Sequence, residues 1–165
     1  MFEPKTIRED AIPAALGRVE RYRLLNEPGV AESICHDILA ARPDNQQAVI
    51  GLVLSLTDQF GSTTEGSFTD VLDLVPRLEE EYERLYYTGV AYERQGKSRL
   101  ARGYPGSQFD AYDLLIEAMD WFEKAGPLHP NDNDDAILRW NSCARLIAGN
   151  ELSPRPVDDV PLMSE

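Results

Sequence analysis

Apolar residues recur at helical spacing along most of the chain, and residues 30–39 show the pattern best. Asn26 is a candidate cap for the start of this segment, Pro28 suits a first helical turn, and Pro43 prevents continuation. The segment therefore predicts an amphipathic helix with a signal at each end. Its apolar side chains fall on two neighbouring ridges, Val30, Ile34 and Ile38 on one and Ala31, Cys35 and Leu39 on the other.

The same period predicts a helix on each side of this segment. Residues 12–23 carry an apolar stripe, with Pro13 acceptable near the start of a helix. Residues 48–60 follow Asp44 and Gln47, which have the spacing of a capping box, and are apolar enough to lie deep in the fold. We expect antiparallel helices connected by short turns.

The second half of the chain is more interrupted. Turn-forming residues at 61–67 predict a surface loop, and a short helix at 69–75 should break at Pro76. An apolar face returns over residues 77–94 and is expected to end at Gly96. Residues 97–107 show no period, so we expect irregular structure there.

Two further helical patterns follow, over residues 111–125 and 133–147, the second capped by Asn131 or Asp132. About seven helices result, and no alternation typical of strands occurs, so the fold class is all-α. Residues 150–165 have no period and contain several prolines and acids, which is typical of an acidic flexible tail after a helical domain at residues 1–149.

The spacing of large and small residues resembles tetratricopeptide repeats, which are about 34 residues long. In the second half, Gly89 and Ala118 would let two helices approach closely, while Tyr92 and Phe122 would fill the space around the contact. The residues at matching offsets are Leu85, Thr88, Gly89, Tyr92, Ala118, Phe122, Ala125 and Pro130, and in the first half Tyr22, Ala31, Cys35 and Pro43.

The resemblance implies TPR-like antiparallel helix pairs in a short right-handed solenoid, with residues 133–147 as a capping helix. The second unit is about 17 residues longer than a repeat, so residues 97–110 are predicted to form an insertion loop. The middle unit, which contains Pro76, is degenerate. An irregular helical bundle is the alternative.

Repeats of this family bind protein segments along a groove that their first helices line. By resemblance, Leu16 and Glu20 would line it beside eight predicted partner-binding residues. Some relatives grip a terminal carboxylate with basic residues, but Glu20 and Glu83 stand at matching places here and would repel it. The alternative is that each position is ordinary surface or core. The eight residues are Arg23, Ile50, Leu54, Tyr86, Val90, Arg94, Asn141 and Arg145.

Composition narrows the class of partner. The formal net charge of −13 disfavours nucleic acid and anionic membranes as partners. It favours a protein or peptide segment with a basic patch, or it serves solubility alone. The opening residues have no apolar core of a secretory signal, and no apolar run approaches a membrane span, so we expect a cytoplasmic protein. The oligomeric state stays open.

Chemistry-bearing residues form no recognisable constellation. Cys35 and Cys143 sit among apolar neighbours and are expected to be buried thiols. Glu32 and His36 are one turn apart but have no evident third metal ligand. His129 has no partner for a catalytic triad. We expect no cofactor, no metal and no catalytic role.

Basic residues gather at the expected insertion. They could recognise an acidic partner or pair with the molecule's own carboxylates, and they are Lys97, Arg99 and Arg102 within it and Arg94 just before it. The leading hypothesis is a non-catalytic adaptor that binds a protein segment in a helical-repeat groove. One alternative is an acidic chaperone for a secreted or membrane-active client, and the other is an enzyme or metal protein of unrecognised type.

Overall fold

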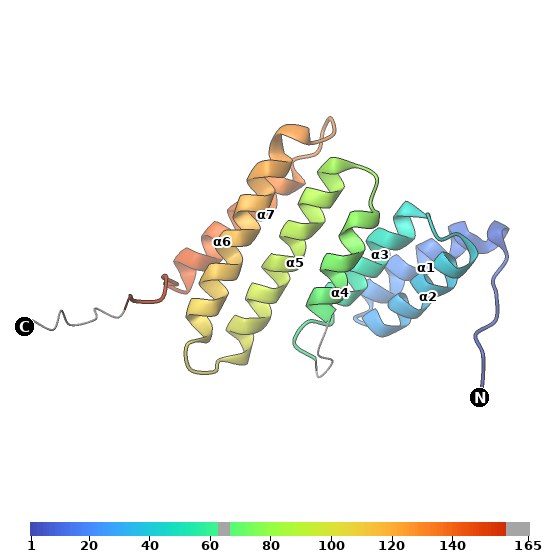
Figure 1. The fold of residues 1–165 in the computed structure, drawn as a ribbon, viewed down its shortest axis with the longest axis horizontal. Coiled ribbons are helices and arrows are strands. Elements are labelled where there is room, and N and C mark those ends of the chain that lie inside the picture. Colours follow the sequence, from blue (N-terminus) through green and yellow to red (C-terminus); the bar gives the residue numbers. More distant parts are fainter. Residues whose placement is uncertain (63–66, 158–165) are drawn as a thin grey trace, which may run out of the picture.

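The computed structural model describes residues 1–62 and 67–157, and within these ranges the chain forms helices and no strand. This confirms the predicted all-α class and the expected number of helices. The helices follow one another along the long axis of the molecule (Figure 1). They are α1 (Ile12–Leu24), α2 (Pro28–Ala41), α3 (Gln46–Thr57), α4 (Ser67–Leu74), α5 (Glu81–Arg102), α6 (Ser107–Ala125) and α7 (Asp135–Gly149), with 3₁₀ turns at Glu9–Ala11, Val75–Arg77 and Gly126–Leu128.

The ends of the first three helices follow local chemistry. Pro28 opens α2, as predicted. Asn26 does not cap that helix, because its φ of 60° is left-handed and Glu27 takes the cap position. The predicted capping box at the start of α3 is also wrong. The side chain of Asn45 caps this helix instead, accepting a hydrogen bond of 2.9 Å from the Ala48 amide.

The predicted break at Pro76 is confirmed. Helix α4 ends at Leu74, and Pro76 lies in the short turn Val75–Arg77, where its missing amide donor breaks no helical hydrogen bond. Of the loop expected at residues 61–67, positions 63–66 lie outside the described residues.

The insertion loop predicted at residues 97–110 is wrong. Helix α5 continues through Gly96 to Arg102, and α6 begins at Ser107, so residues 103–106 alone connect them. Gly96 is a packing position, because a Cβ there would lie 3.1 Å from the Cγ of Leu115 on α6. Gly103 ends the helix with a left-handed φ of 65°. The surplus residues therefore lengthen both helices of one hairpin.

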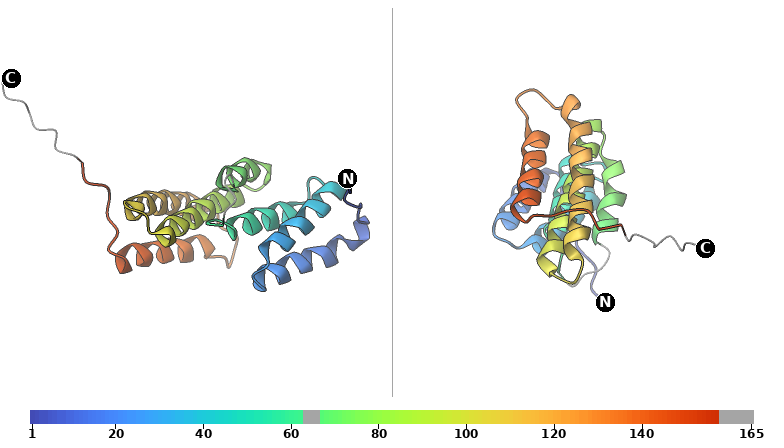
Figure 2. Two further views of the ribbon diagram at one scale, coloured as in Figure 1. Left: turned by 90° about the horizontal axis from the view of Figure 1, so that it is seen from below. Right: turned by 90° about the vertical axis from the view of Figure 1, so that its left-hand side faces the viewer.

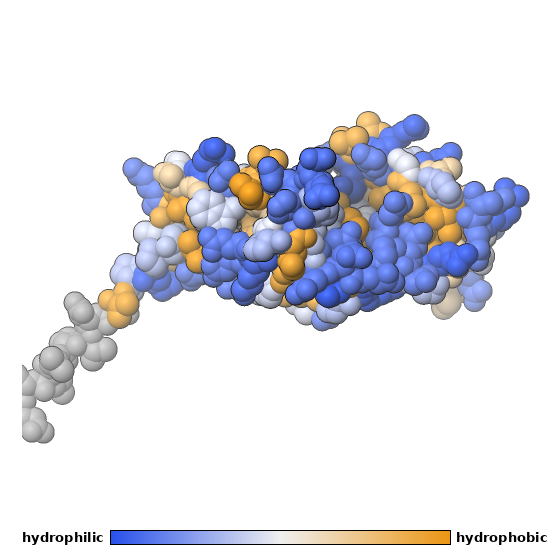
Figure 3. Space-filling model, turned by 90° about the horizontal axis from the view of Figure 1, so that it is seen from above, coloured by the Kyte–Doolittle hydropathy of each residue, from blue (hydrophilic) through white to orange (hydrophobic). Residues whose placement is uncertain are grey.

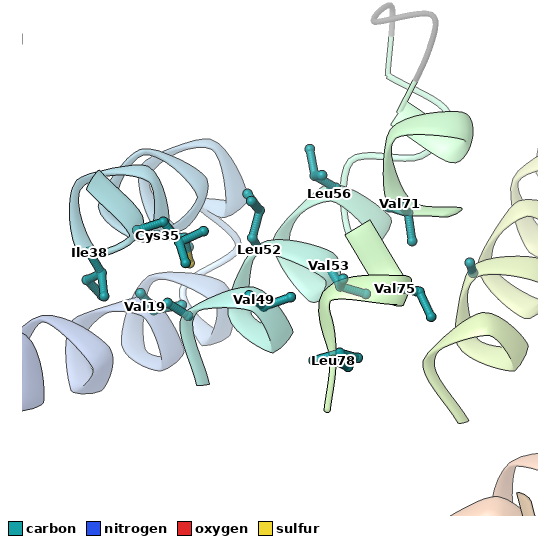
Figure 4. Packing of buried hydrophobic residues seen from close by; sticks show 14 of the residues in the cluster. Val19, Cys35, Ile38, Val49, Leu52, Val53, Leu56, Val71, Val75 and Leu78 are labelled. Atoms are coloured by element: carbon teal, nitrogen blue, oxygen red, sulfur yellow. The ribbon is translucent and has the colours of Figure 1, made fainter. Parts of the chain in front are cut away.

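Two hydrophobic clusters form the core, and α3 and α5 join them. The first cluster packs α1 to α4 around fully buried side chains such as Ile38 and Val53 (Figure 4). The second packs α5, α6 and α7 around Leu115 and Phe122. Ala91 on α5 belongs to the first cluster, and Leu54 on α3 packs against the second.

Helices α5 and α6 pack closely at Gly89. A Cβ on Gly89 would lie 2.6 Å from the Cε1 of Phe122, and the Phe122 ring is 1% exposed. Ala118 is fully buried in the same cluster. The predicted roles of Gly89, Ala118 and Phe122 in a close helix contact are confirmed, while Tyr92 packs edge-on against Phe68, with ring centroids 5.2 Å apart.

The segment after α7 packs against the domain. Leu152 is 8% exposed and belongs to the second cluster. The Nη2 of Arg155 lies 3.1 Å from the Oδ1 of Asp110, and its guanidinium carbon lies 5.1 Å from the centre of the Phe109 ring. The tail predicted from residue 150 thus contacts the domain at Leu152 and Arg155, and residues 158–165 lie outside the described part of the chain.

We predict that Gly89→Ala lowers the free energy of unfolding by about 1–3 kcal/mol, because the new methyl group would collide with the enclosed Phe122 ring. Gly17→Ala is the matched control, since no atom outside its own neighbourhood in α1 lies within 4 Å of the new Cβ. That change should raise stability by about 0.5–1 kcal/mol through helix propensity. Urea denaturation measures both, and equal effects would contradict the close contact.

Leu152→Ala is predicted to destabilise the fold by about 2 kcal/mol, because it removes a buried side chain from the second cluster. Val157→Ala, at a side chain that is 90% exposed, should change stability by less than about 0.5 kcal/mol. Thermal and chemical unfolding check the difference. An unaltered Leu152→Ala protein would show that the segment after α7 is not part of the core.

Candidate functional site

The first candidate surface is a hollow of about 420 Å³ between α1 and α3, here named the α1–α3 hollow. Three predicted partner-binding residues, Arg23, Ile50 and Leu54, line it together with Leu16 and Glu20, which the resemblance also placed in a groove. Its floor is thus apolar and its rim carries one acid and one base. The other lining residues are Gly17, Val19, Gln47 and Gly51.

Asp58 connects the α1–α3 hollow to α5. Its carboxylate receives a hydrogen bond of 2.7 Å from the Nε of Arg23, and the Nη1 of Arg94 lies 3.4 Å from its other oxygen. The Asp58 side chain is 18% exposed. Because both guanidinium groups pair with this carboxylate, Arg23 and Arg94 hold α1, the end of α3 and α5 together and are not free anchors for an acidic ligand.

A second hollow of about 440 Å³ lies where α5 and α7 begin, and we name it the tyrosine hollow. Figure 3 looks onto this edge of the molecule, where hydrophobic patches are separated by hydrophilic residues. Tyr82, Tyr86 and Tyr87 contribute one wall and residues from the turn before α7 the other. The full lining is Glu80, Tyr82, Glu83, Tyr86, Tyr87, Leu128, Pro130, Asn133 and Asp135.

The three tyrosine rings have two orientations. The rings of Tyr82 and Tyr86 are nearly parallel, with centroids 5.7 Å apart, and Tyr87 stands edge-on to Tyr86 at 5.0 Å. Burial raises the pKa of Tyr82 to about 12, and the neighbouring Tyr86 and Asp135 add to the effect. The hydroxyls therefore stay protonated and neutral at physiological pH.

A charge network behind the tyrosine hollow connects α5 with α7. The Nε of Arg139 donates a hydrogen bond of 2.8 Å to the Tyr86 hydroxyl, and its Nη1 lies 3.0 Å from a carboxylate oxygen of Glu93. Lys97 pairs with the other oxygen of Glu93, whose side chain is 2% exposed. The network fixes the position of Tyr86 relative to α7.

The remaining predicted partner-binding residues lie elsewhere. Val90 is fully buried, so a partner cannot reach its side chain and this prediction is wrong. Tyr86 lines the tyrosine hollow but is only 8% exposed. On α7, Asn141 is half-buried and Arg145 exposed, and neither lines either hollow. The predicted set is thus divided between two hollows, an ion-pair cluster, the core and a part of α7 that lines neither hollow.

Sequence reasoning missed two features of this surface. It named Glu83 as a poor match for a carboxylate grip, but it did not place Glu83 together with Tyr82 and Tyr87. Their positions relative to Tyr86, at the first turns of one helix, are the signal that could have indicated a tyrosine cluster. It also missed Arg139, whose partner Glu93 is distant in the sequence.

The buried cysteines are unsuited to nucleophilic chemistry. Cys35 and Cys143 are free and fully buried, as expected, and burial raises the pKa of each to about 12, which keeps the thiol protonated. The Nε2 of His36 lies 3.6 Å from a carboxylate oxygen of Glu32. In residues 1–62 and 67–157, no three His, Cys, Asp or Glu side chains gather as metal ligands would. No helix in the described part of the chain has the length and apolarity to cross a membrane.

Comparison of the chain with known proteins found no relative. Neither the protein-family models nor the curated proteins nor the solved structures gave a match to the chain.

We predict that Arg139→Leu destabilises the fold by about 2 kcal/mol, because Glu93 would stay buried with Lys97 as its remaining basic partner. Adding Glu93→Leu should restore part of the loss by removing the buried charge. Arg145→Leu, at an exposed position on the same helix, is the control and should change stability by less than about 0.5 kcal/mol. Equal losses for Arg139→Leu and Arg145→Leu in urea denaturation would contradict the network.

Proposed function

We propose that this chain is a non-catalytic interaction module that binds an extended segment of another protein across the surface formed by α1, α3, α5 and α7. The observation that carries the proposal is the α1–α3 hollow. Its lining includes five of the positions predicted for a binding groove, with an apolar floor and charged groups at the rim. Such a mixture suits recognition of a peptide, since apolar side chains supply area and polar groups supply orientation.

The packing supports a TPR-like repeat as the scaffold. Gly89 faces the large Phe122, whereas the first unit has Val19 and Cys35 at the same offsets. Val19 and Cys35 each lie 3.1 Å from where a Cβ on Gly51 would stand, so both pack beside α3 in the first core (Figure 4). The second unit thus pairs a small glycine with a large phenylalanine, and the first unit has two residues of intermediate size at the same offsets. The volume filled at the contact between the two helices is therefore similar in both units.

The arrangement of helices also fits such a scaffold. Each helix contacts the next one in the sequence, from α1 through to α7. In Figure 2, left, α1 and α7 lie toward one side of the molecule and α4 and α6 toward the other. A short right-handed solenoid with α7 as its cap would place alternate helices on one binding surface in this way.

The proposal includes the class of partner. A formal net charge of −13 favours a basic protein segment and disfavours nucleic acid and anionic membranes, and a cytoplasmic setting is proposed with it. An acidic chaperone would use the same surface for an unfolded client. The two roles differ in outcome, because a chaperone keeps a co-expressed client in solution and an adaptor binds a partner that is already folded.

We predict that a photo-crosslinking residue at Gly17 or Glu20 captures one defined segment of a partner, because both positions are exposed and line the α1–α3 hollow. The matched control is the same residue at Asp113, which is exposed on α6 and lines neither hollow. Mass spectrometry of the crosslinked products identifies the segment.

A synthetic peptide with the captured sequence should then bind the Glu20→Lys variant about tenfold more weakly than the native chain, while Asp113→Lys should bind it normally. Equal crosslinking from Gly17, Glu20 and Asp113, or unchanged affinity in Glu20→Lys, would rule out this surface. Circular dichroism confirms that each variant is folded.

A further inference from the structure

The lining of the tyrosine hollow has an unusual charge balance. Three of its nine residues are acids, Glu80, Glu83 and Asp135, and none is a lysine or arginine. None of these three carboxylates forms an ion pair with a residue in the described part of the chain. In the α1–α3 hollow, by contrast, the acid Glu20 is accompanied by Arg23. The tyrosine hollow is therefore a concave surface with an unbalanced negative charge.

The aromatic wall of the hollow suits a cation. A positive charge is attracted to the face of a tyrosine ring within about 6 Å of its centre. Tyr82 and Tyr87 are half-buried, so they are in part open to solvent, and both rings pack against the buried Tyr86. The chain already uses this attraction from behind the wall, where the Arg139 guanidinium carbon lies 5.7 Å from the Tyr86 ring centre.

The position of Glu83 adds an independent reason. Its side chain is half-buried on the first turn of α5, and burial raises the pKa of its carboxyl, with the charge of Glu80 as the second cause. The negative charge at this position is thus poorly compensated by the chain, and a cation in the hollow would stabilise it. The starts of α5 and α7 would favour an anion, but an anion would meet three carboxylates at close range.

We infer that the tyrosine hollow binds the lysine or arginine side chain of a basic segment in the partner protein, its charge held between the tyrosine faces and Glu83. The inference rests on the proposed function and specifies the chemistry of the partner at one end of the binding surface. A volume of about 440 Å³ is ample for one such side chain, and the acidity of the whole chain would attract a basic segment from a distance.

The test is an NMR titration of the full chain, carrying labelled tyrosine rings, with four capped tripeptides. Their central residues are lysine, arginine, norleucine and glutamate. Lysine or arginine peptide should shift the ring signals of Tyr82 and Tyr87 saturably, with weaker binding at high salt. Norleucine has the apolar stem without the charge, so it separates recognition of a cation from apolar filling.

Glu83→Gln should weaken binding of the basic tripeptide about three- to tenfold. The matched control is Glu81→Gln, which removes the same charge from an exposed position on the same turn outside the hollow, and it should bind normally. Four results would overturn the inference: no saturable shift, norleucine binding as well as lysine, equal loss in both variants, or ring shifts caused by self-association of the chain without peptide.

The titration and the crosslinking experiment separate the two claims. If a partner segment is captured at Glu20 but the tripeptides leave the tyrosine rings unaltered, the proposed function stands and the cation site is wrong. If the basic tripeptides bind and no partner segment depends on the α1–α3 hollow, the cation site stands and the extended binding surface is wrong.

Discussion

The close contact between α5 and α6 is the constraint on which the rest of the second half depends. Gly89 has no room for a Cβ beside Phe122, and Gly96 has little beside Leu115, so the two helices approach closely over a long stretch. This hairpin is the platform against which α7 packs. Since α5 begins beside the start of α7, the same contact determines where the walls of the tyrosine hollow stand.

Charge at the proposed binding surface is partly used to hold the helices in place. Arg23 and Arg94 meet at Asp58, and Lys97 and Arg139 meet at Glu93. Each of these four basic side chains thus pairs with an internal acid. The carboxylates of the tyrosine hollow form no such ion pair with the described residues, and this contrast is the physical reason for proposing a basic partner.

Helix periodicity predicted most of the fold, because apolar residues that face one core must recur on one side of a helix. The contact of Gly89 with Phe122 was also accessible, since small and large residues stand at repeat offsets. Gly96 was misinterpreted as a terminator. Glycine both ends helices and permits close packing, and local sequence alone does not distinguish these roles. Leu152 was missed because a single apolar residue in a proline-containing segment shows no period.

The candidate site was predictable only in part. Leu16, Ile50 and Leu54 were assigned to a groove by resemblance to the repeat pattern, and the structure brings them together. Val90 was assigned to the surface although it is fully buried, since a helix that packs on both sides has no simple polar face. Pairings between distant residues, such as Glu93 with Arg139, depend on tertiary structure and leave no local signal.

The measurement that tests the account most directly is a double-mutant cycle between Gly89→Ala and Phe122→Leu, followed by urea denaturation. If the collision with the Phe122 ring is the cause of the loss, Gly89→Ala should cost less stability when leucine replaces the ring, with a coupling energy of about 1–3 kcal/mol. Additive losses would show that the two residues do not meet, and the close packing of α5 on α6 would then be wrong.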